Sequence, residues 1–315
     1  SCRDKDTIDI FILHPHNRTS EIQRKQMTTV LAANVYNIAL KGPFDDCQTI
    51  VKGLFGDLEF RDRYKLSAVN SINWARIMAQ VVYYVYAALT LGAPERSLSF
   101  AVPTGNFGNV FAAYVAKQMG LPICQLAVGT NKNDILTRFF ETGEMRTSSV
   151  SPSISPSMDI QISSNFERLL FETYGRDAER VAQTMEKFQE TGIFSVPSKI
   201  LTEMRKTFVG GRLDDEATAQ VISDIYHRSG ELIDPHTAVA CAPYLLKNLS
   251  EESVHISLAC AHPSKFPSAV KAAVGISPKL PDFVGDLFKR QEQFTVLDNQ
   301  QAMVKAFVEQ QLAMG

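Results

Sequence analysis

Short apolar runs alternate with longer amphipathic runs through residues 1–146 of the chain. The short runs, rich in Val, Ile and Phe, predict strands over residues 8–13, 35–40, 66–69, 97–102 and 123–128. The longer runs predict helices over residues 20–30, 44–58, 75–91, 110–120 and 134–142. Strands that alternate with helices over short connections are typical of a mostly parallel sheet covered by helices on both faces. The pattern therefore predicts an α/β fold.

The alternation breaks at a Ser- and Pro-rich loop or linker, residues 147–157. Beyond it, amphipathic spacing predicts four successive helices, over residues 165–174, 177–191, 198–209 and 214–230. The last part of the chain predicts a helix over 236–249, a strand over 254–258, a helix over 265–274, and two peripheral helices around a short strand within 282–314. We therefore expect a small α/β domain over residues 1–92 and a large one over residues 93–315, with a helical insertion at about 158–230.

Composition narrows the class of protein. The 315 residues carry a formal net charge of −2, and basic and acidic residues are mixed along the chain. The sequence therefore shows no cluster of basic residues of the kind that binds nucleic acid or an anionic membrane. The longest apolar run, residues 81–93, is too short for a bilayer, which takes about 20 residues. The five cysteines are scattered and form no C-x-x-C pair, and the histidines show no metal spacing. We expect a cytoplasmic protein without a metal site.

The most informative stretch is Pro103-Thr-Gly-Asn-Phe-Gly-Asn-Val110, which joins a predicted strand to a predicted helix. A glycine-containing turn at a helix start can point several backbone N–H groups at one phosphate, because the helix dipole adds partial positive charge there. Gly105 and Gly108 would allow a positive φ and close backbone approach. The spacing matches neither nucleotide-binding glycine fingerprint, which counts against a nucleotide-binding protein. The alternative is an ordinary connection that carries two glycines.

A second helix start follows the predicted strand 66–69. Asn70, Ser71 and Asn73 offer neutral donors there, and Arg76 offers a guanidinium fork that suits a phosphate monoester. The alternative is a simple helix cap with a solvated arginine. If both helix starts bind phosphate, the site holds two phosphates, one on a cofactor and one on a substrate.

Cys260 and His262 follow the predicted strand 254–258 and raise a different possibility, a nucleophile and its base. Residues two apart on a strand seldom bond to each other, and the sequence shows no third group that would orient the histidine. We treat this as a minor alternative.

Taken together, the motifs resemble the threonine synthase family, in the form found in bacteria and fungi. Seven blocks carry the resemblance: Asn70-Ser-Ile-Asn-Trp-Ala-Arg76, Pro103-Thr-Gly-Asn-Phe-Gly-Asn109, Thr130-Asn-Lys-Asn-Asp134, Ser155-Pro-Ser-Met-Asp-Ile160, Asn165-Phe-Glu-Arg168, Ile233-Asp-Pro-His-Thr-Ala238 and Ala261-His-Pro-Ser-Lys-Phe266. The blocks run in order over nearly the whole chain. The resemblance implies pyridoxal-phosphate (PLP) fold type II, the tryptophan-synthase-β-like fold.

The resemblance also implies the chemistry. It assigns the PLP phosphate to the turn formed by Gly105, Asn106, Phe107, Gly108 and Asn109. It assigns the phosphate of O-phospho-L-homoserine to Asn70, Ser71 and Arg76. The implied enzyme is a carbon–oxygen lyase acting on phosphates that converts O-phospho-L-homoserine and water to L-threonine and phosphate, with PLP as the electron sink. The implied partner is this small-molecule substrate. We further expect a monomer or a homodimer, and no nucleic-acid or membrane partner.

Two departures from the family pattern stand out. The family's Schiff-base lysine lies in a motif resembling Phe-Lys-Asp, followed later by a Ser-Gly-Asp-Thr-Gly loop, and neither occurs in these residues. We therefore expect the chain to begin just after that loop, no catalytic lysine to be present, and the polypeptide alone to be inactive; Lys265 lies in a shared block and is no replacement. Cys260 stands where the family places a hydroxyl residue facing the pyridine nitrogen, and a thiol is a weaker hydrogen-bonding partner.

Two functional alternatives stay open at this point. A threonine-synthase-like phospholyase would use the same two phosphate sites but release a 2-oxoacid and ammonia. A non-catalytic relative would only bind phosphate ligands.

Overall fold

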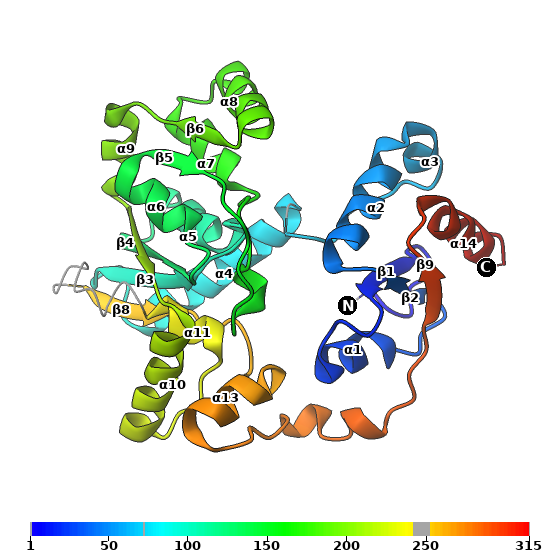
Figure 1. Ribbon diagram of the computed structural model, residues 1–315. Helices are drawn as coiled ribbons and strands as arrows, with labels where there is room; N and C mark the ends of the chain where they lie inside the picture. The colour runs from blue at the N-terminus through cyan, green and yellow to red at the C-terminus, as the bar shows by residue number, and fades with distance from the viewer. Residues whose placement is uncertain (1, 72, 242–252, 315) are drawn as a thin grey trace. The chain divides into compact units, whose positions relative to one another are not determined.

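The computed structural model describes residues 2–71, 73–241 and 253–314, and these fall into two compact units (Figure 1). Unit 1 combines Ser1–Ser67 with Lys279–Gly315, and unit 2 is Ala68–Pro278. The division into domains 1–92 and 93–315 stays a prediction. The units differ from it in assigning the C-terminal segment to the N-terminal unit.

Unit 1 is a three-stranded parallel sheet in the order β1-β2-β9, with strands Ile10–Pro15, Val35–Lys41 and Thr295–Asp298. Its helices are α1 Glu21–Thr28, α2 Phe44–Gly56, α3 Leu58–Arg63 and α14 Gln301–Met314. The short C-terminal strand is thus confirmed, but it belongs to the sheet of the first two strands. Only one long helix, α14, follows it, and 282–289 form two 3₁₀ turns. Val304 and Val308 of α14 share a core with Ile38 and Leu40 of β2.

An ion-pair cluster also joins the C-terminal segment to α1. Glu292 accepts hydrogen bonds from Arg24 Nε at 2.8 Å and from the Thr28 hydroxyl at 2.8 Å, and Lys25 Nζ lies 3.4 Å from its carboxylate. The hydrogen bond from Arg24 is the main reason that the pKa of the Glu292 carboxyl falls from its ordinary 4.5 to about 2. The carboxylate is therefore part of what holds residues 279–315 in unit 1.

We expect Glu292→Gln to lower the free energy of unfolding of unit 1 by about 1–2 kcal/mol at pH 7, allowing for partial screening by solvent. Because the folded-state pKa is depressed, the contribution of Glu292 is complete above its unfolded pKa and is lost as pH falls through about 2. Thermal unfolding from pH 7 to pH 2 should show the two proteins converging. Glu59→Gln, at an exposed position, is the control, and a pH-independent gap would contradict the ion-pair explanation.

Unit 2 is built on a four-stranded sheet in the order β7-β4-β3-β8, with all neighbours parallel. Its strands are β3 Leu98–Pro103, β4 Ile123–Thr130, β7 Phe208–Arg212 and β8 Val254–Ser257. The helices that follow or precede them are α4 Trp74–Thr90, α5 Gly108–Gln118, α6 Ile135–Thr142, α10 Asp215–Ser229, α11 Pro235–Ala240 and α13 Pro267–Val274. The predicted alternation is confirmed for β3, α5, β4 and α6.

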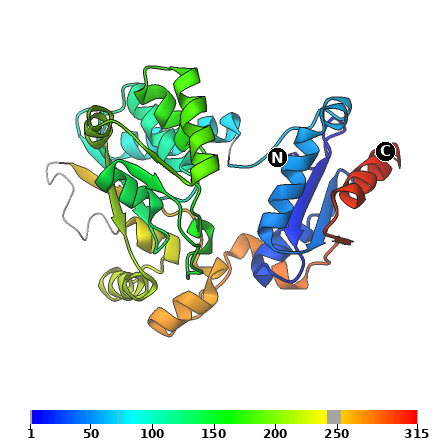
Figure 2. The ribbon, with the colours of Figure 1, turned by 45° about the horizontal axis from the view of Figure 1, so that its top comes forward.

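Helices lie on both faces of this sheet (Figures 1 and 2), and alternate residues of β3 pack against them. Phe100 and Val102 join the main core with residues of α4 and α5. Ala101 lies instead with Ala127 of β4 and Ala240 of α11 on the other face. Small residues are needed there because α11 approaches β4 so closely that a Cβ on Gly129 would lie 2.6 Å from a backbone oxygen of α11. The sheet is therefore sandwiched between helices.

The predicted helical insertion is only partly helical. Its helices are α7 Phe166–Thr173, α8 Ala178–Thr191, α9 Ser198–Arg205 and α10, and a small antiparallel pair joins β5 Glu144–Arg146 to β6 Ile193–Ser195. Residues 208 and 209, the predicted end of the helix 198–209, instead begin the strand β7, which hydrogen-bonds to β4. The predicted strand 66–69 is wrong, since these residues are in no strand and Val69 is 83% exposed. Of the predicted helix 236–249, residues 242–249 lie outside the described residues.

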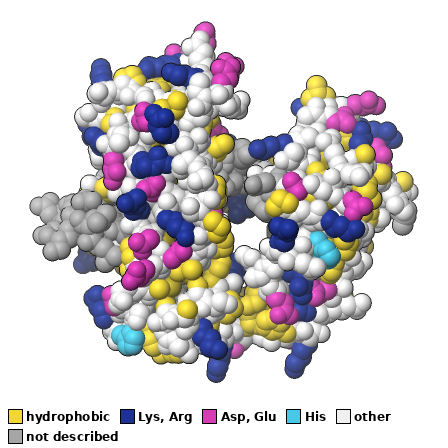
Figure 3. Space-filling model, in the orientation of Figure 1, with side chains coloured by type: hydrophobic (Ala, Val, Ile, Leu, Met, Phe, Trp, Pro, Cys, Tyr) yellow, Lys and Arg dark blue, Asp and Glu magenta, His cyan; other side chains and the backbone are white. Residues whose placement is uncertain are grey.

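Basic and acidic side chains are interspersed over the face shown in Figure 3, in keeping with the near-zero net charge. In the part of the chain that the structure describes, no helix is long and apolar enough to cross a membrane.

Candidate active site

The predicted cofactor residues gather at one edge of the unit 2 sheet. Because β3, β4 and β8 are parallel, their carboxyl ends lie at the same edge, and each is followed by a motif singled out from the sequence. Pro103 precedes the glycine-containing turn, Thr130 precedes a polar loop, and Cys260 follows β8. This edge is where open α/β sheets bind their ligands.

The turn between β3 and α5 has the geometry of an anion site. Among the described residues, the backbone N–H groups of residues 105–110 have no hydrogen-bond acceptor, and no side chain caps the helix start. Buried or partly buried N–H groups are rarely left without an acceptor. Together with the positive end of the α5 dipole, these N–H groups fit the phosphate of PLP.

The residue with a positive φ in this turn is Phe107, at 54°, and not either glycine. A bulky residue adopts this conformation only when its surroundings hold it, and such strain gathers at functional sites. The Phe107 side chain is 1% exposed and packs on the rings of Phe166 and Phe208. Phe107 can therefore contribute only its backbone to a ligand.

Gly105 and Gly108 allow other segments of the chain to lie close to the backbone of the turn. A Cβ on Gly105 would lie 2.9 Å from the Ser157 carbonyl oxygen, and a Cβ on Gly108 would lie 3.4 Å from the Ser71 carbonyl oxygen. The Ser163 hydroxyl also donates to the Gly105 carbonyl at 2.6 Å. The turn is thus packed against two other segments of the chain.

One of these segments is the second predicted helix start. Asn73 caps α4 by accepting from the Ala75 N–H at 2.9 Å, and its own amide donates to the Ala68 carbonyl. This contact agrees with the alternative given in the sequence analysis, in which Asn73 only caps the helix. Arg76, in the first turn of α4, is exposed, and in the described residues it makes no ion pair.

Asn165 links the two predicted phosphate-binding turns, and no sequence argument assigned it a role. Its side-chain Nδ2 donates to the Ser71 carbonyl at 2.9 Å and to the Asn106 carbonyl at 2.8 Å. Asn165 is completely buried and has a φ of 72°, a left-handed conformation that asparagine tolerates better than most residues. The structure thus places Ser71 beside Asn106.

Asn109 and Cys260 are also brought together. The Asn109 Nδ2 donates to the Cys260 Sγ at 3.3 Å, and the buried Tyr84 hydroxyl lies 2.7 Å from the Asn109 Oδ1, to which it can donate. The Cys260 side chain is accessible, yet enough protein surrounds the sulfur to raise the pKa of the thiol to about 11. The thiol is therefore protonated at neutral pH, and its proton remains available to an acceptor.

The buried pair Asp234 and His236 holds Ser157, the residue that packs against Gly105 of the turn between β3 and α5. His236 Nδ1 lies 2.8 Å from an Asp234 oxygen, and its Nε2 accepts from the Ser157 N–H at 3.3 Å. With Nε2 as an acceptor, the ring hydrogen on Nδ1 is the one that faces Asp234. Burial raises the pKa of Asp234, but hydrogen bonds from His236 and Thr237 outweigh it and leave the pKa below its usual value. The pair holds Ser157, which packs on Gly105.

The polar loop after β4 is structural. The Asn131 and Asn133 amides donate to the Asp159 Oδ1 at 2.8 and 3.0 Å, and the Ser153 hydroxyl donates to the same oxygen. The Ser- and Pro-rich stretch 147–157 is consequently pinned to the loop after β4.

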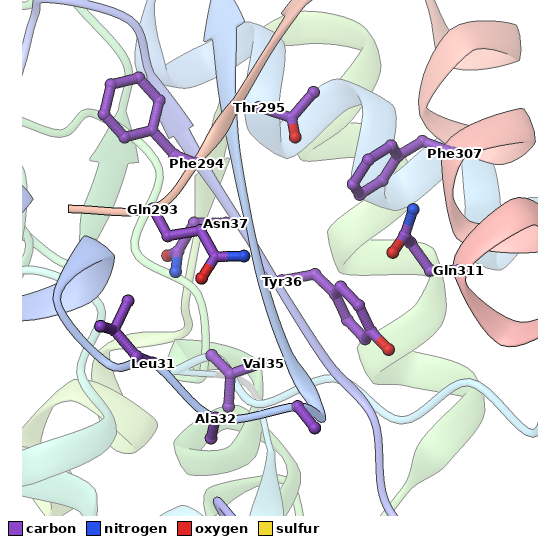
Figure 4. Close-up of a pocket in the computed structure, with 11 residues that line it drawn as sticks. Leu31, Ala32, Val35, Tyr36, Asn37, Gln293, Phe294, Thr295, Phe307 and Gln311 are labelled. Atoms are coloured by element: carbon purple, nitrogen blue, oxygen red, sulfur yellow. The ribbon is translucent and has the colours of Figure 1, made fainter. Parts of the chain in front are cut away.

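Two other candidate sites have less structural support. His262 Nδ1 lies 2.8 Å from the Ser264 hydroxyl and caps a 3₁₀ turn, so the Cys260–His262 pair gains no support. A hollow of about 280 Å³ lies within unit 1 (Figure 4), lined by apolar groups, amides and the hydroxyls of Tyr36 and Thr295. Among the described residues, no cluster of three or more His, Cys, Asp or Glu could hold a metal ion.

Comparison with known proteins gives consistent matches. The family described as "Pyridoxal-phosphate dependent enzyme" matches residues 2–198, and "Threonine synthase, C-terminal" matches residues 237–308. The threonine synthase of Pseudomonas aeruginosa is 53% identical over 310 residues, covering 98% of this chain and 66% of the relative.

Solved structures agree with this result. A PLP-bound threonine synthase from Brucella melitensis has 51% identity and a TM-score of 0.94, covering 98% of this chain and 66% of that one. The yeast threonine synthase has 39% identity and a TM-score of 0.90, covering 99% and 66%. This chain therefore spans about two thirds of the length of the relatives it matches. The predicted PLP fold type II is confirmed, and the chain belongs to the pyridoxal-phosphate-dependent enzymes and, within them, to the threonine synthase family.

Proposed function

We propose that the protein to which these residues belong is a threonine synthase, which converts O-phospho-L-homoserine and water to L-threonine and phosphate. The observation that carries the proposal is the pair of helix starts, α5 and α4, held side by side by Asn165. One presents backbone N–H groups without acceptors, and the other presents Arg76. Two adjacent anion sites suit a phosphorylated cofactor and a phosphorylated substrate.

The residues of this chain would then have distinct roles. The N–H groups of the turn from Gly105 to Asn109 would hold the PLP phosphate. Asn70, Ser71 and Arg76 would hold the substrate phosphate, with Arg76 supplying the positive charge that a leaving phosphate needs. PLP, when bound, supplies the electron sink for carbanion chemistry.

Cys260 would contact the pyridine nitrogen. Asn109 donates to the Cys260 sulfur, and Tyr84 fixes which end of the Asn109 amide faces it. Because the pKa of the thiol is about 11, Cys260 would act as a neutral donor and not as a thiolate. The hydroxyl residue of the family pattern would likewise be a neutral hydrogen-bond donor.

The Schiff-base lysine has no candidate in a matching context among the 315 residues. We propose that it lies in the third of the relatives' length that this chain does not span. The 315-residue polypeptide by itself is then expected to form no threonine.

The test is a product assay with O-phospho-L-homoserine on the full-length protein, with the 315-residue polypeptide in parallel. Equal amounts of L-threonine and phosphate from the full-length protein support the proposal. A 2-oxoacid with ammonia would assign a phospholyase, and no turnover would assign a ligand-binding relative. Turnover by the 315-residue polypeptide would overturn the assignment of the lysine.

A further inference from the structure

We propose that Asn165 is a positioning residue that sets the separation of the two phosphate-binding turns, so that the substrate phosphate and the cofactor phosphate are held in one fixed relation. The inference rests on the proposed function in one respect, since the turns are ligand sites only under it. The hydrogen bonds themselves do not depend on any function.

Both hydrogens of the Asn165 side-chain amide are donated to backbone carbonyls. One is donated to the Ser71 carbonyl at 2.9 Å and the other to the Asn106 carbonyl at 2.8 Å, so a single nitrogen joins the two turns. Asn165 is 0% exposed. Removing its amide would leave two partly buried carbonyl oxygens without this donor.

The orientation of the amide is itself fixed. Arg168 Nε donates to the Asn165 Oδ1 at 3.0 Å, which leaves only the nitrogen end of the amide to face the carbonyls. The Arg168 guanidinium in turn lies 5.6 Å from the ring centre of Trp74, the first residue of α4. The start of α7 therefore holds the start of α4 through both residues.

Gly108 shows how close the turns are. A Cβ at this position would lie 3.4 Å from both the Asn165 Nδ2 and the Ser71 carbonyl oxygen. Because α5 begins at Gly108, the helix start that would bind the cofactor phosphate touches the segment that would bind the substrate phosphate. A shift of one turn must move the other unless Asn165 releases it.

The test uses the full-length protein and two variants of Asn165. Asn165→Gly removes the amide but accepts the φ of 72°, and Asn165→Asp keeps the shape but replaces the donor with an acceptor. The Kd of PLP is measured by equilibrium dialysis, and the Kd of inorganic phosphate for the PLP-saturated protein by titration calorimetry. We expect both Kd values to rise about tenfold or more in both variants.

Asn17→Gly is the matched control, because Asn17 also has a positive φ, of 58°, but is exposed. Its Kd values should stay within about twofold of the wild type. Asn165 variants with a lower melting temperature but wild-type Kd values would mean that the residue only stabilises the fold, and would overturn the proposal. If neither Asn165 variant folds, Arg168→Met decides, because it removes the hydrogen bond to the Asn165 Oδ1 and the contact with Trp74. It should raise the same two Kd values, and unchanged values would overturn the proposal.

The two proposals can fail separately. A wild-type protein that makes no threonine, with variants that lose affinity for PLP and phosphate, would refute the proposed function and leave the role of Asn165 intact. A wild-type protein that makes threonine, with variants that bind both ligands normally, would refute the role of Asn165 alone.

Discussion

Replacing Arg76 with methionine should lower kcat/KM for O-phospho-L-homoserine about a hundredfold, by raising KM and by lowering kcat, because Arg76 would hold the substrate phosphate both when it binds and when it leaves. The guanidinium is exposed at the start of α4 and makes no ion pair among the described residues, so it is available to a ligand. Charge-assisted, two-pronged hydrogen bonds to a phosphate are the strongest that a side chain can offer. The measurement is steady-state kinetics on the full-length protein, together with the Kd of PLP, which should not change.

Two further variants make the result specific. Arg76→Lys keeps the charge but loses the fork, and should recover part of the lost kcat/KM. Arg96→Met removes another exposed arginine of unit 2 and should behave as wild type. If Arg76→Met also behaves as wild type, Arg76 is a solvated charge and the start of α4 is an ordinary helix cap.

Gly105→Ala should weaken PLP binding by about tenfold to a hundredfold, because overpacking a tight contact costs roughly 1–3 kcal/mol. The new Cβ would lie 2.9 Å from the Ser157 carbonyl oxygen, which belongs to the backbone and cannot rotate away. The Ser157 segment is held in turn by His236 and Asp234. The turn itself must therefore shift and disturb its N–H groups.

Absorbance titration of the full-length variant with PLP gives its Kd. Gly56→Ala is the matched control, since it adds the same methyl group where no atom lies within 4 Å. An unchanged Kd for Gly105→Ala would contradict the assignment of the cofactor phosphate to this turn.

The local parts of the fold were predictable from the sequence. Leu98–Pro103, Gly108–Gln118 and Ile123–Thr130 each show the apolar pattern of the element they form, and the turn between the first two carries the glycines that a phosphate site requires. The prediction of a strand over 66–69 is wrong because a run of four residues, three of them apolar, cannot be distinguished from an exposed connection by its pattern alone. Residues 208–212 were missed because two glycines interrupt the apolar pattern of this strand.

The sequence predicts the individual turns of the candidate site, but it does not predict how these turns are arranged relative to one another. The sequence indicates that Asn106 and Ser71 lie at two helix starts, but nothing in it says that one amide joins them. Asn165 is far from both along the chain, and the block that contains it indicates the start of a helix but no contact with either turn. Its role depends on a positive φ and on complete burial, and neither property is visible without the fold.

The position of β9 has a consequence for how the chain folds during synthesis. The contacts of unit 2 are complete once residue 278 has been made, but the sheet of unit 1 needs β9, where Thr295 pairs with Ile38. At ribosomal rates of about 5–20 residues per second, β9 is made roughly 10–50 s after β2. One edge of β2 has no partner strand during this interval. An open parallel strand edge can pair with the wrong segment during that interval. Unit 1, and not the unit with the candidate site, is therefore where misfolding of a newly made chain should begin.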